Sequence, residues 1–142
     1  MTSRCPLILS LLFLTLGSLS ASSIVEEGFA DFRARGAEAA LKTWGKSSSD
    51  PANLDEQGKF QELIRQEKLL GACLGYEIRF KCDLGSGSSL YLISSRFDKG
   101  TLFFRFLVFT DTLNRSSLTL LHWSPDPVGV WPEKVLFPDK KN

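Results

Sequence analysis

The sequence predicts an α+β fold in which two N-terminal helices pack on a four-stranded antiparallel meander sheet. Apolar residues recur every three to four positions up to about residue 70 and every two positions after residue 75. This change of period indicates helices followed by strands. A run of helices before a run of strands favours an antiparallel sheet with the helices on one face.

The first predicted helix spans Ile24–Trp44, and the second begins at Asp50-Pro51 or near Leu54, with its end bracketed by Gly71 and Gly75. Glu26 and other charged residues lie between the apolar positions, as on an amphipathic helix. Gly36 is a weak point inside the first helix. Serine-rich sequence after Trp44 favours a turn between the two helices.

The strands are predicted from period-two alternation and from turn residues. From Tyr76 to Cys82 the apolar side chains alternate with charged ones, which predicts one buried face and one wet face. The stretch Gly85–Ser89 is predicted as a flexible hairpin loop, and Asp98–Gly100 as a tight turn. The four predicted strands are about Tyr76–Cys82, Leu90–Phe97, Thr101–Thr110 and Ser117–Trp123.

The N-terminus has the pattern of a cleaved signal peptide over residues 1–21. One positive charge, Arg4, precedes the apolar run Leu7–Leu16, and small residues then offer a cleavage site within Ser20–Ser22. The apolar run is shorter than the roughly 20 residues of a spanning helix, so no stable membrane anchor is expected. The chain is predicted to be exported, to a periplasm or by secretion. Residues 22–138 then form one domain, followed by a polar tail over 139–142.

Charge balance argues against nucleic-acid binding. The chain has 17 Lys and Arg against 16 Asp and Glu, and removal of Arg4 leaves equal numbers. A nucleic-acid surface requires an excess of basic residues.

Cys73 and Cys82 are the two cysteines that remain after cleavage of the signal peptide. If Tyr76–Cys82 is extended, it covers roughly 20 Å. A disulfide needs Cα atoms within about 7 Å, so none is expected and both thiols are predicted to be free and buried. Two cysteines and one histidine lack the clustered spacing of a zinc site, so no metal and no cofactor is predicted.

The segment Leu102–Phe109 is apolar on both faces, so both faces of this strand must be covered. One face is expected to pack on the helices. The other is predicted to meet a partner subunit, the C-terminal residues Val128–Phe137 or a ligand.

Arg105 is the one charge within this segment and shares a face with Phe103, Leu107 and Phe109. A buried arginine needs a partner. That partner is predicted to be Asp98, Glu77 or a helix carboxylate, with an anionic ligand as the alternative. The candidate ligand-binding residues are Arg105, Phe103, Leu107, Tyr91 and His122.

No catalytic residue is predicted. His122 is the single histidine, and neither Ser94 nor Ser95 lies in the Gly-x-Ser-x-Gly turn that activates a serine nucleophile. Gly85-Ser86-Gly87 lacks the Lys-Ser/Thr ending of a phosphate loop. Asn114-Arg115-Ser116 matches a glycosylation acceptor in a predicted turn.

Two groups of segments carry a family resemblance: Leu70-Gly71 with Leu74–Glu77, and Arg96–Phe106. They resemble small exported bacterial proteins of unknown function, which look like members of the cystatin-like or nuclear-transport-factor-2-like α+β group. The resemblance implies a curved sheet that wraps helices. It also implies a cavity that in some relatives binds a small molecule or carries isomerase or dehydratase residues, and a sheet that often forms dimers.

The sequence thus favours a non-catalytic binding or protein-interaction module that uses its apolar sheet face. This interpretation predicts a homodimer or a protein partner on that face. The alternative is a carrier for an anionic or apolar small molecule, with a pocket between helices and sheet. A cavity enzyme is the weakest hypothesis, because no Tyr/Asp pair can be placed in a cavity and Tyr76 and Tyr91 are the only tyrosines.

Overall fold

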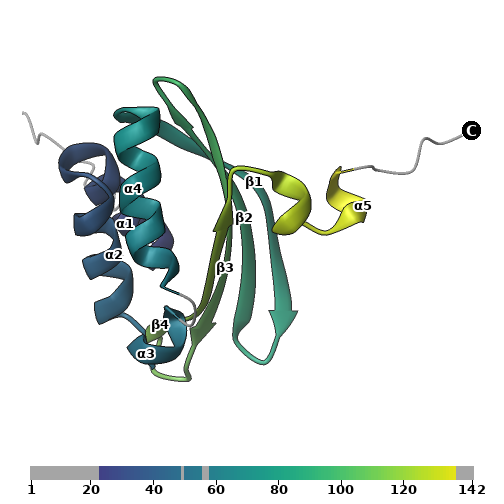
Figure 1. Ribbon diagram of the computed structural model, residues 1–142. Coiled ribbons are helices and arrows are strands. Elements are labelled where there is room, and N and C mark those ends of the chain that lie inside the picture. The colour runs from purple at the N-terminus through teal and green to yellow at the C-terminus, as the bar shows by residue number, and fades with distance from the viewer. Residues whose placement is uncertain (1–22, 49, 56–57, 137–142) are drawn as a thin grey trace, which may run out of the picture.

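The computed structural model describes residues 23–48, 50–55 and 58–136, and the α+β fold is confirmed (Figure 1). The helices that precede the strands in the chain lie on one side of a four-stranded antiparallel meander with the strand order β1-β2-β3-β4, and the C-terminal helical turns lie on the other. The predicted signal peptide and the polar tail after residue 138 lie outside the described residues. The elements are α1 Ile24–Arg35, α2 Ala37–Lys46, α3 Pro51–Leu54, α4 Lys59–Leu70, β1 Cys73–Gly85, β2 Ser88–Phe97, β3 Gly100–Thr110, β4 Ser116–Ser124, η1 Pro127–Gly129 and α5 Glu133–Leu136.

Gly36 divides the first predicted helix into α1 and α2. Its φ of 95° is a conformation that side-chain-bearing residues rarely adopt, so the helix ends there. The new helix start is capped from a distance, because the Ala37 N–H donates to Glu67 Oε2 of α4 at 2.8 Å. At the other end of α1, Ser23 and Glu26 form a capping box.

The second predicted helix is also divided, into the short α3 and the 12-residue α4. Gly58, with a φ of 65°, precedes the first residue of α4. Gly71 ends α4 as expected, and its neighbour Ala72 donates its N–H to Asp98 Oδ2 at 3.0 Å. None of the helices within the described ranges has both the length and the apolar character needed to cross a membrane.

The sheet register follows from the tight β2–β3 turn. Phe97 pairs with Gly100 across the two turn residues Asp98 and Lys99, so that each β2 residue is matched to one β3 residue down to Ser88–Phe109. Directly opposed residues place their side chains on the same face. The turn therefore decides which β2 and β3 side chains face the helices.

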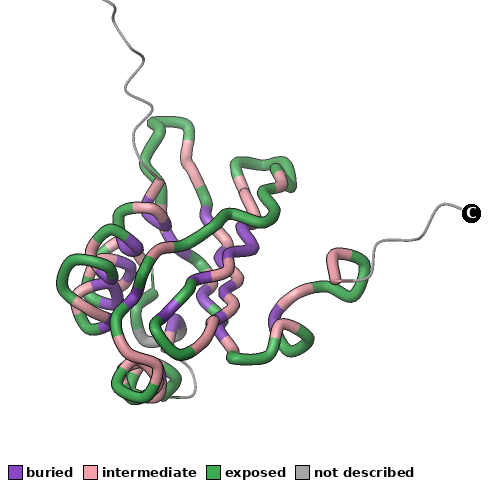
Figure 2. The backbone as a smooth tube through the Cα atoms, turned by 90° about the horizontal axis from the view of Figure 1, so that it is seen from above, coloured by how far each residue is buried: buried purple, intermediate pink, exposed green. Residues whose placement is uncertain are grey.

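Aromatic rings fill the space between the helices and the sheet, and Phe29 of α1 lies at their centre. Its ring centroid is 4.7 Å from that of Tyr76, 5.1 Å from Trp44, 5.2 Å from Phe104 and 5.8 Å from Phe106. Such ring pairs each stabilise a fold by roughly 0.5–1.5 kcal/mol beyond the burial of their area. Figure 2 shows the buried residues concentrated where the two layers face each other.

β1 differs from its prediction of one buried and one wet face. A β-bulge between Ile78 and Phe80 shifts the register, so Ile78 opposes Ile93 on the helix side whereas Phe80 opposes Leu92 on the other side. The alternation of the sequence is thus interrupted by one residue. Tyr76, Ile78 and Phe80 are each more than a third exposed.

We expect Gly28→Ala to destabilise the fold by about 2 kcal/mol, because a Cβ at this position would overlap the Trp44 indole in a closely packed core. Urea unfolding measures the change. Gly45→Ala is the matched control, because a Cβ there has no neighbouring atom within 4 Å. An unchanged midpoint for Gly28→Ala would contradict the packing of Trp44 against α1.

Asp31 links α1 to α2, because its carboxylate accepts hydrogen bonds from the Thr43 hydroxyl and the Arg35 guanidinium. These bonds lower the pKa of Asp31 below its ordinary value of 3.8, and the hydrogen bond from Thr43 has the largest effect. A lowered folded-state pKa contributes stability above the unfolded-state value, and this contribution is lost as the pH falls through the folded-state pKa.

Asp31→Asn should therefore lower the urea midpoint at neutral pH, and its difference from the parent chain should close as the pH falls below 3.8. Glu38→Gln, at an exposed ion pair with Lys42, serves as the control and should show little change. An equal difference in urea midpoint between Asp31→Asn and the parent chain at neutral and at acid pH would contradict the role of the ionised carboxylate.

Candidate functional site: the outer face of the sheet

The face of the sheet that points away from the helices is called the outer face here. Cross-strand pairing places Leu92, Arg105 and His122 in one line across β2, β3 and β4. The next line runs through all four strands and is called the apolar row: Cys82, Leu90, Leu107 and Leu120. The predicted shared face of Arg105, Phe103, Leu107 and Phe109 is this face.

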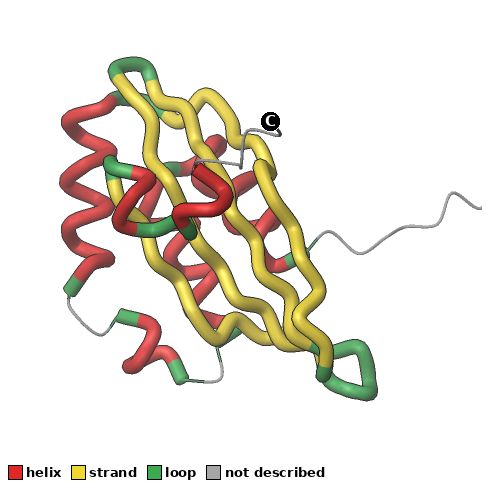
Figure 3. Tube along the Cα trace, turned by 90° about the vertical axis from the view of Figure 1, so that its right-hand side faces the viewer, coloured by secondary structure: helices red, strands yellow, loops and turns green. Residues whose placement is uncertain are grey.

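The C-terminal segment covers part of the outer face, as Figure 3 shows with η1 and α5 in front of the strands. Trp131 donates its indole N–H to the Phe104 carbonyl at 3.1 Å, and its ring lies edge-on to Phe103 with centroids 5.1 Å apart. Val130 is only 3% exposed. One of the three predicted covers, the tail from Val128, is thus present at Phe103, and Phe137 lies outside the described residues.

The apolar row is wider than its four members, because Phe80 and Phe109 adjoin it along β1 and β3. Each of these phenylalanines is 39% exposed. Strands are spaced about 4.8 Å apart, so a row across four strands is roughly 14 Å wide. Exposed large apolar side chains that cluster in this way are typical of interaction surfaces.

Arg105 and His122 form the polar part of the outer face. Arg105 Nη2 lies 2.8 Å from His122 Nδ1, and a guanidinium can only donate, so this nitrogen of the imidazole accepts. Arg105 Nε is buried and has no hydrogen-bond partner among the residues that the structure describes. The prediction that Arg105 pairs with Asp98, Glu77 or a helix carboxylate is therefore wrong, because the register of β3 and β4 brings His122 to it instead.

Tyr91 does not belong with the other four predicted binding residues. It opposes Phe106 on the helix side of the sheet, is 6% exposed and lies 5.1 Å below the Lys81 ammonium. The two-residue turn at Asp98–Lys99 could have predicted this position, because it sets the register that places Tyr91 on the helix side. It matches Arg105 to Leu92, so Leu92 is the β2 residue beside Arg105.

Both serines are separated from the histidine, because Ser94 lies on the outer face with strand β3 between it and His122, and Ser95 lies on the opposite face. Ser95 is fully buried on the helix side, where its hydroxyl donates to the Gly75 carbonyl at 3.1 Å and lies 3.4 Å from Cys73 Sγ. His122 is on the outer face, so Ser95 and His122 cannot form a nucleophile and base pair. Within the described ranges, no three His, Cys, Asp or Glu side chains are grouped as metal ligands would be.

The two cysteines occupy opposite faces. Cys73 is buried on the helix side opposite Phe97, whereas Cys82 opposes Leu90 and is partly exposed. Both are free thiols. The prediction of two buried thiols is correct for Cys73 and wrong for Cys82, because the bulge in β1 turns Cys82 to the outer face.

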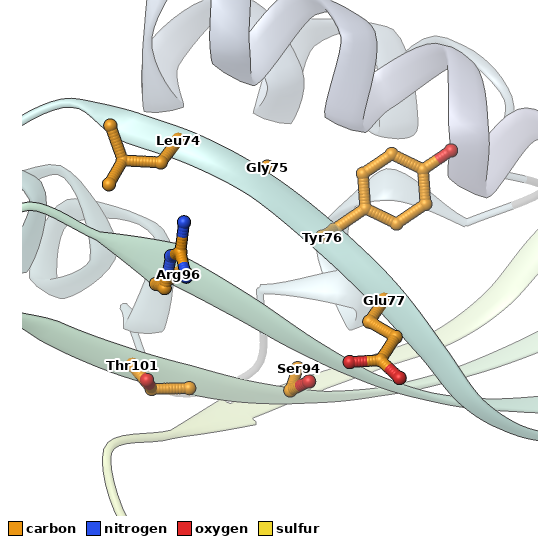
Figure 4. A pocket seen from close by; sticks show the side chains of 7 residues that line it. All are labelled: Leu74, Gly75, Tyr76, Glu77, Ser94, Arg96 and Thr101. Atoms are coloured by element: carbon orange, nitrogen blue, oxygen red, sulfur yellow. The ribbon is translucent and has the colours of Figure 1, made fainter.

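A shallow hollow of about 300 Å³ lies at the start of β1. In Figure 4, Arg96 and Glu77 border this hollow, while the Tyr76 ring extends from β1 toward the helices. Ser94 and Thr101 complete its polar lining. The described lining of the hollow has no histidine and no cysteine, and Glu77 is its single carboxylate, so it lacks a pair of groups for acid–base proton transfer.

No protein-family model, curated protein or solved structure matches this chain. The resemblance to the cystatin-like or nuclear-transport-factor-2-like group therefore stays a prediction. Function has to be argued from the geometry of the described residues.

Trp131→Ala should release the C-terminal segment and speed tryptic cleavage after the exposed Lys134 several-fold, because Trp131 holds the segment to β3. Trp131→Phe keeps the ring on Phe103 and loses the hydrogen bond, so its cleavage rate should be intermediate. Mass spectrometry monitors the cleavage. Equal cleavage rates for the parent chain and both variants would contradict the attachment of the C-terminal segment to β3.

Proposed function

We propose that this chain is a non-catalytic interaction module that binds a protein partner through the apolar row of its outer face. The observation that carries the proposal is the row of Cys82, Leu90, Leu107 and Leu120, extended by the exposed Phe80 and Phe109. A partner with apolar side chains would remove these groups from water, at roughly 25 cal/mol per Å² of buried apolar area.

The polar pair beside the row supports a defined docking position. Arg105 and His122 lie next to the apolar row, and a guanidinium carries five N–H donors. Interfaces combine an apolar centre with a few polar groups that fix orientation. A partner with a carbonyl or carboxylate opposite Arg105 would fit this arrangement.

The carrier hypothesis finds less support. Its pocket was expected between helices and sheet, where the Phe29, Trp44, Phe104 and Phe106 rings are in mutual contact. Ligand pockets need several hundred Å³ of space. These rings fill the centre of that space, and the groove of about 600 Å³ between α1 and β1 is an open hollow at its edge.

Position-specific photo-crosslinking tests the proposal. A benzophenone amino acid is introduced at Phe80 or at Phe109, and the chain is produced in its source cells. Both positions should yield the same adduct mass, because the two side chains flank one surface.

Leu69 of α4 is the control position, because it is 61% exposed and belongs to a helix on the other side of the sheet. An adduct from Leu69 of equal yield, or none from Phe80 and Phe109, would contradict the proposal. Adducts of different mass from Phe80 and Phe109 would contradict a single docking surface.

A further inference from the structure

β1 is an edge strand with unequal halves. It pairs with β2 alone, so every second residue directs its backbone N–H and C=O away from the sheet. In the second half, the bulge at Ile78–Phe80 and the inward-facing Lys81 are features that discourage further strand pairing. A further bulge lies at Leu74, between Cys73 and Gly75, so the regularly paired first half of β1 is Gly75–Ile78. It lacks an inward-facing charge and exposes Tyr76 and Ile78 by 38% and 36%.

A groove runs along this first half between β1 and α1. Its volume is about 600 Å³, and its lining includes Gly75 and Tyr76 from the strand. From α1 it is lined by Glu26, Ala30 and Arg33, together with Phe29 and Ala34. Residues 26, 30 and 33 have the i, i+4, i+7 spacing of one helix face.

The charges of this helix face are arranged symmetrically. Glu26 and Arg33 carry opposite charges about 10.5 Å apart along the helix axis, with Ala30 between them. Arg33 is exposed and forms no ion pair among the described residues. Two copies of the face, placed antiparallel, would bring each Glu26 opposite the Arg33 of the other copy.

We propose that a second copy of this chain binds here, with α1 against α1 and the first half of β1 against the first half of β1. A single two-fold axis, perpendicular to the sheet near Ala30 and Tyr76, generates both contacts. It makes both the helix pair and the strand pair antiparallel, and an interface of this kind uses the same surface on both copies.

The small side chain of Ala30 at the axis suits the close approach of two helices, whose axes pack at about 8–10 Å. The free N–H and C=O groups of the two β1 strands pair below the helices. The bulge after Ile78 bends the second half of each strand away from the axis.

This dimer is separate from the outer face. A two-fold axis perpendicular to the sheet keeps α1, α2 and α4 of both copies on one side and places both outer faces together on the other side. The dimer would present two apolar rows in one direction, and it would form whether or not the proposed protein partner binds.

Charge reversal at the two positions tests the proposal by sedimentation velocity and native mass spectrometry. The parent chain should be dimeric in the micromolar range. Arg33→Glu and Glu26→Lys, each alone, replace two attractive contacts with two repulsive ones and should weaken the dimer by about tenfold or more.

An equimolar mixture of Arg33→Glu and Glu26→Lys should restore the dimer as a heterodimer of the two masses, because both contacts become attractive again. Arg65→Glu on α4 is the matched control, since Arg65 is an exposed helical arginine away from the groove, and it should stay dimeric. Far-UV circular dichroism checks the folding of each variant, because Glu26→Lys removes the Glu26 carboxylate of the α1 capping box whereas Arg33→Glu leaves the box intact.

A monomeric parent chain would overturn the proposal. Dimers that persist in both charge-reversal variants would also overturn it, because they would require another interface. A mixture of the two variants that forms no heterodimer would overturn it as well.

Discussion

The fold depends on the position of the Phe29 ring. This ring of α1 contacts one ring from α2, one from β1 and two from β3. It therefore links α1 both to the neighbouring helix and to the sheet. Gly28 beside it leaves the space that the Trp44 indole occupies. Removal of the Phe29 ring would remove aromatic contacts of α1 with the sheet and with α2 at the same time.

The aromatic rings fill the centre of the molecule, and both proposed binding surfaces lie on its outside. The rings between the layers hold α1 over β1, which leaves the flank of α1 with Ala30 facing the free strand edge. On the other side of the sheet, Trp131 covers Phe103 and leaves Phe109 exposed. The two surfaces argued above, the apolar row and the α1–β1 edge, therefore lie on different sides of one rigid core.

Most of the element order was predictable from the sequence, since the change in apolar period after Gly75 marks the passage from helices to strands. The division at Gly36 was not, because the group that caps α2 is Glu67, thirty residues away in the chain from Ala37. Local sequence identifies the weak glycine, but the distant carboxylate makes the break a stable structure.

The candidate site was predicted in part for a similar reason. Period two correctly grouped Arg105 with Phe103 and Leu107 within one strand, whereas grouping across strands needs the register. The tight turn fixes that register for Tyr91, which the turn assigns to the helix side. The bulge after Ile78 leaves no such signal in the sequence, so the outward position of Phe80 and Cys82 appears only in the structure.

The claim that binding occurs on the outer surfaces is tested most directly by native mass spectrometry of the purified chain, compared with its denatured mass. The native masses should be whole multiples of the chain mass, with no retained small molecule. A stoichiometric extra mass that is lost on denaturation would contradict the claim, because the chain would then hold a small molecule and fit the carrier hypothesis instead.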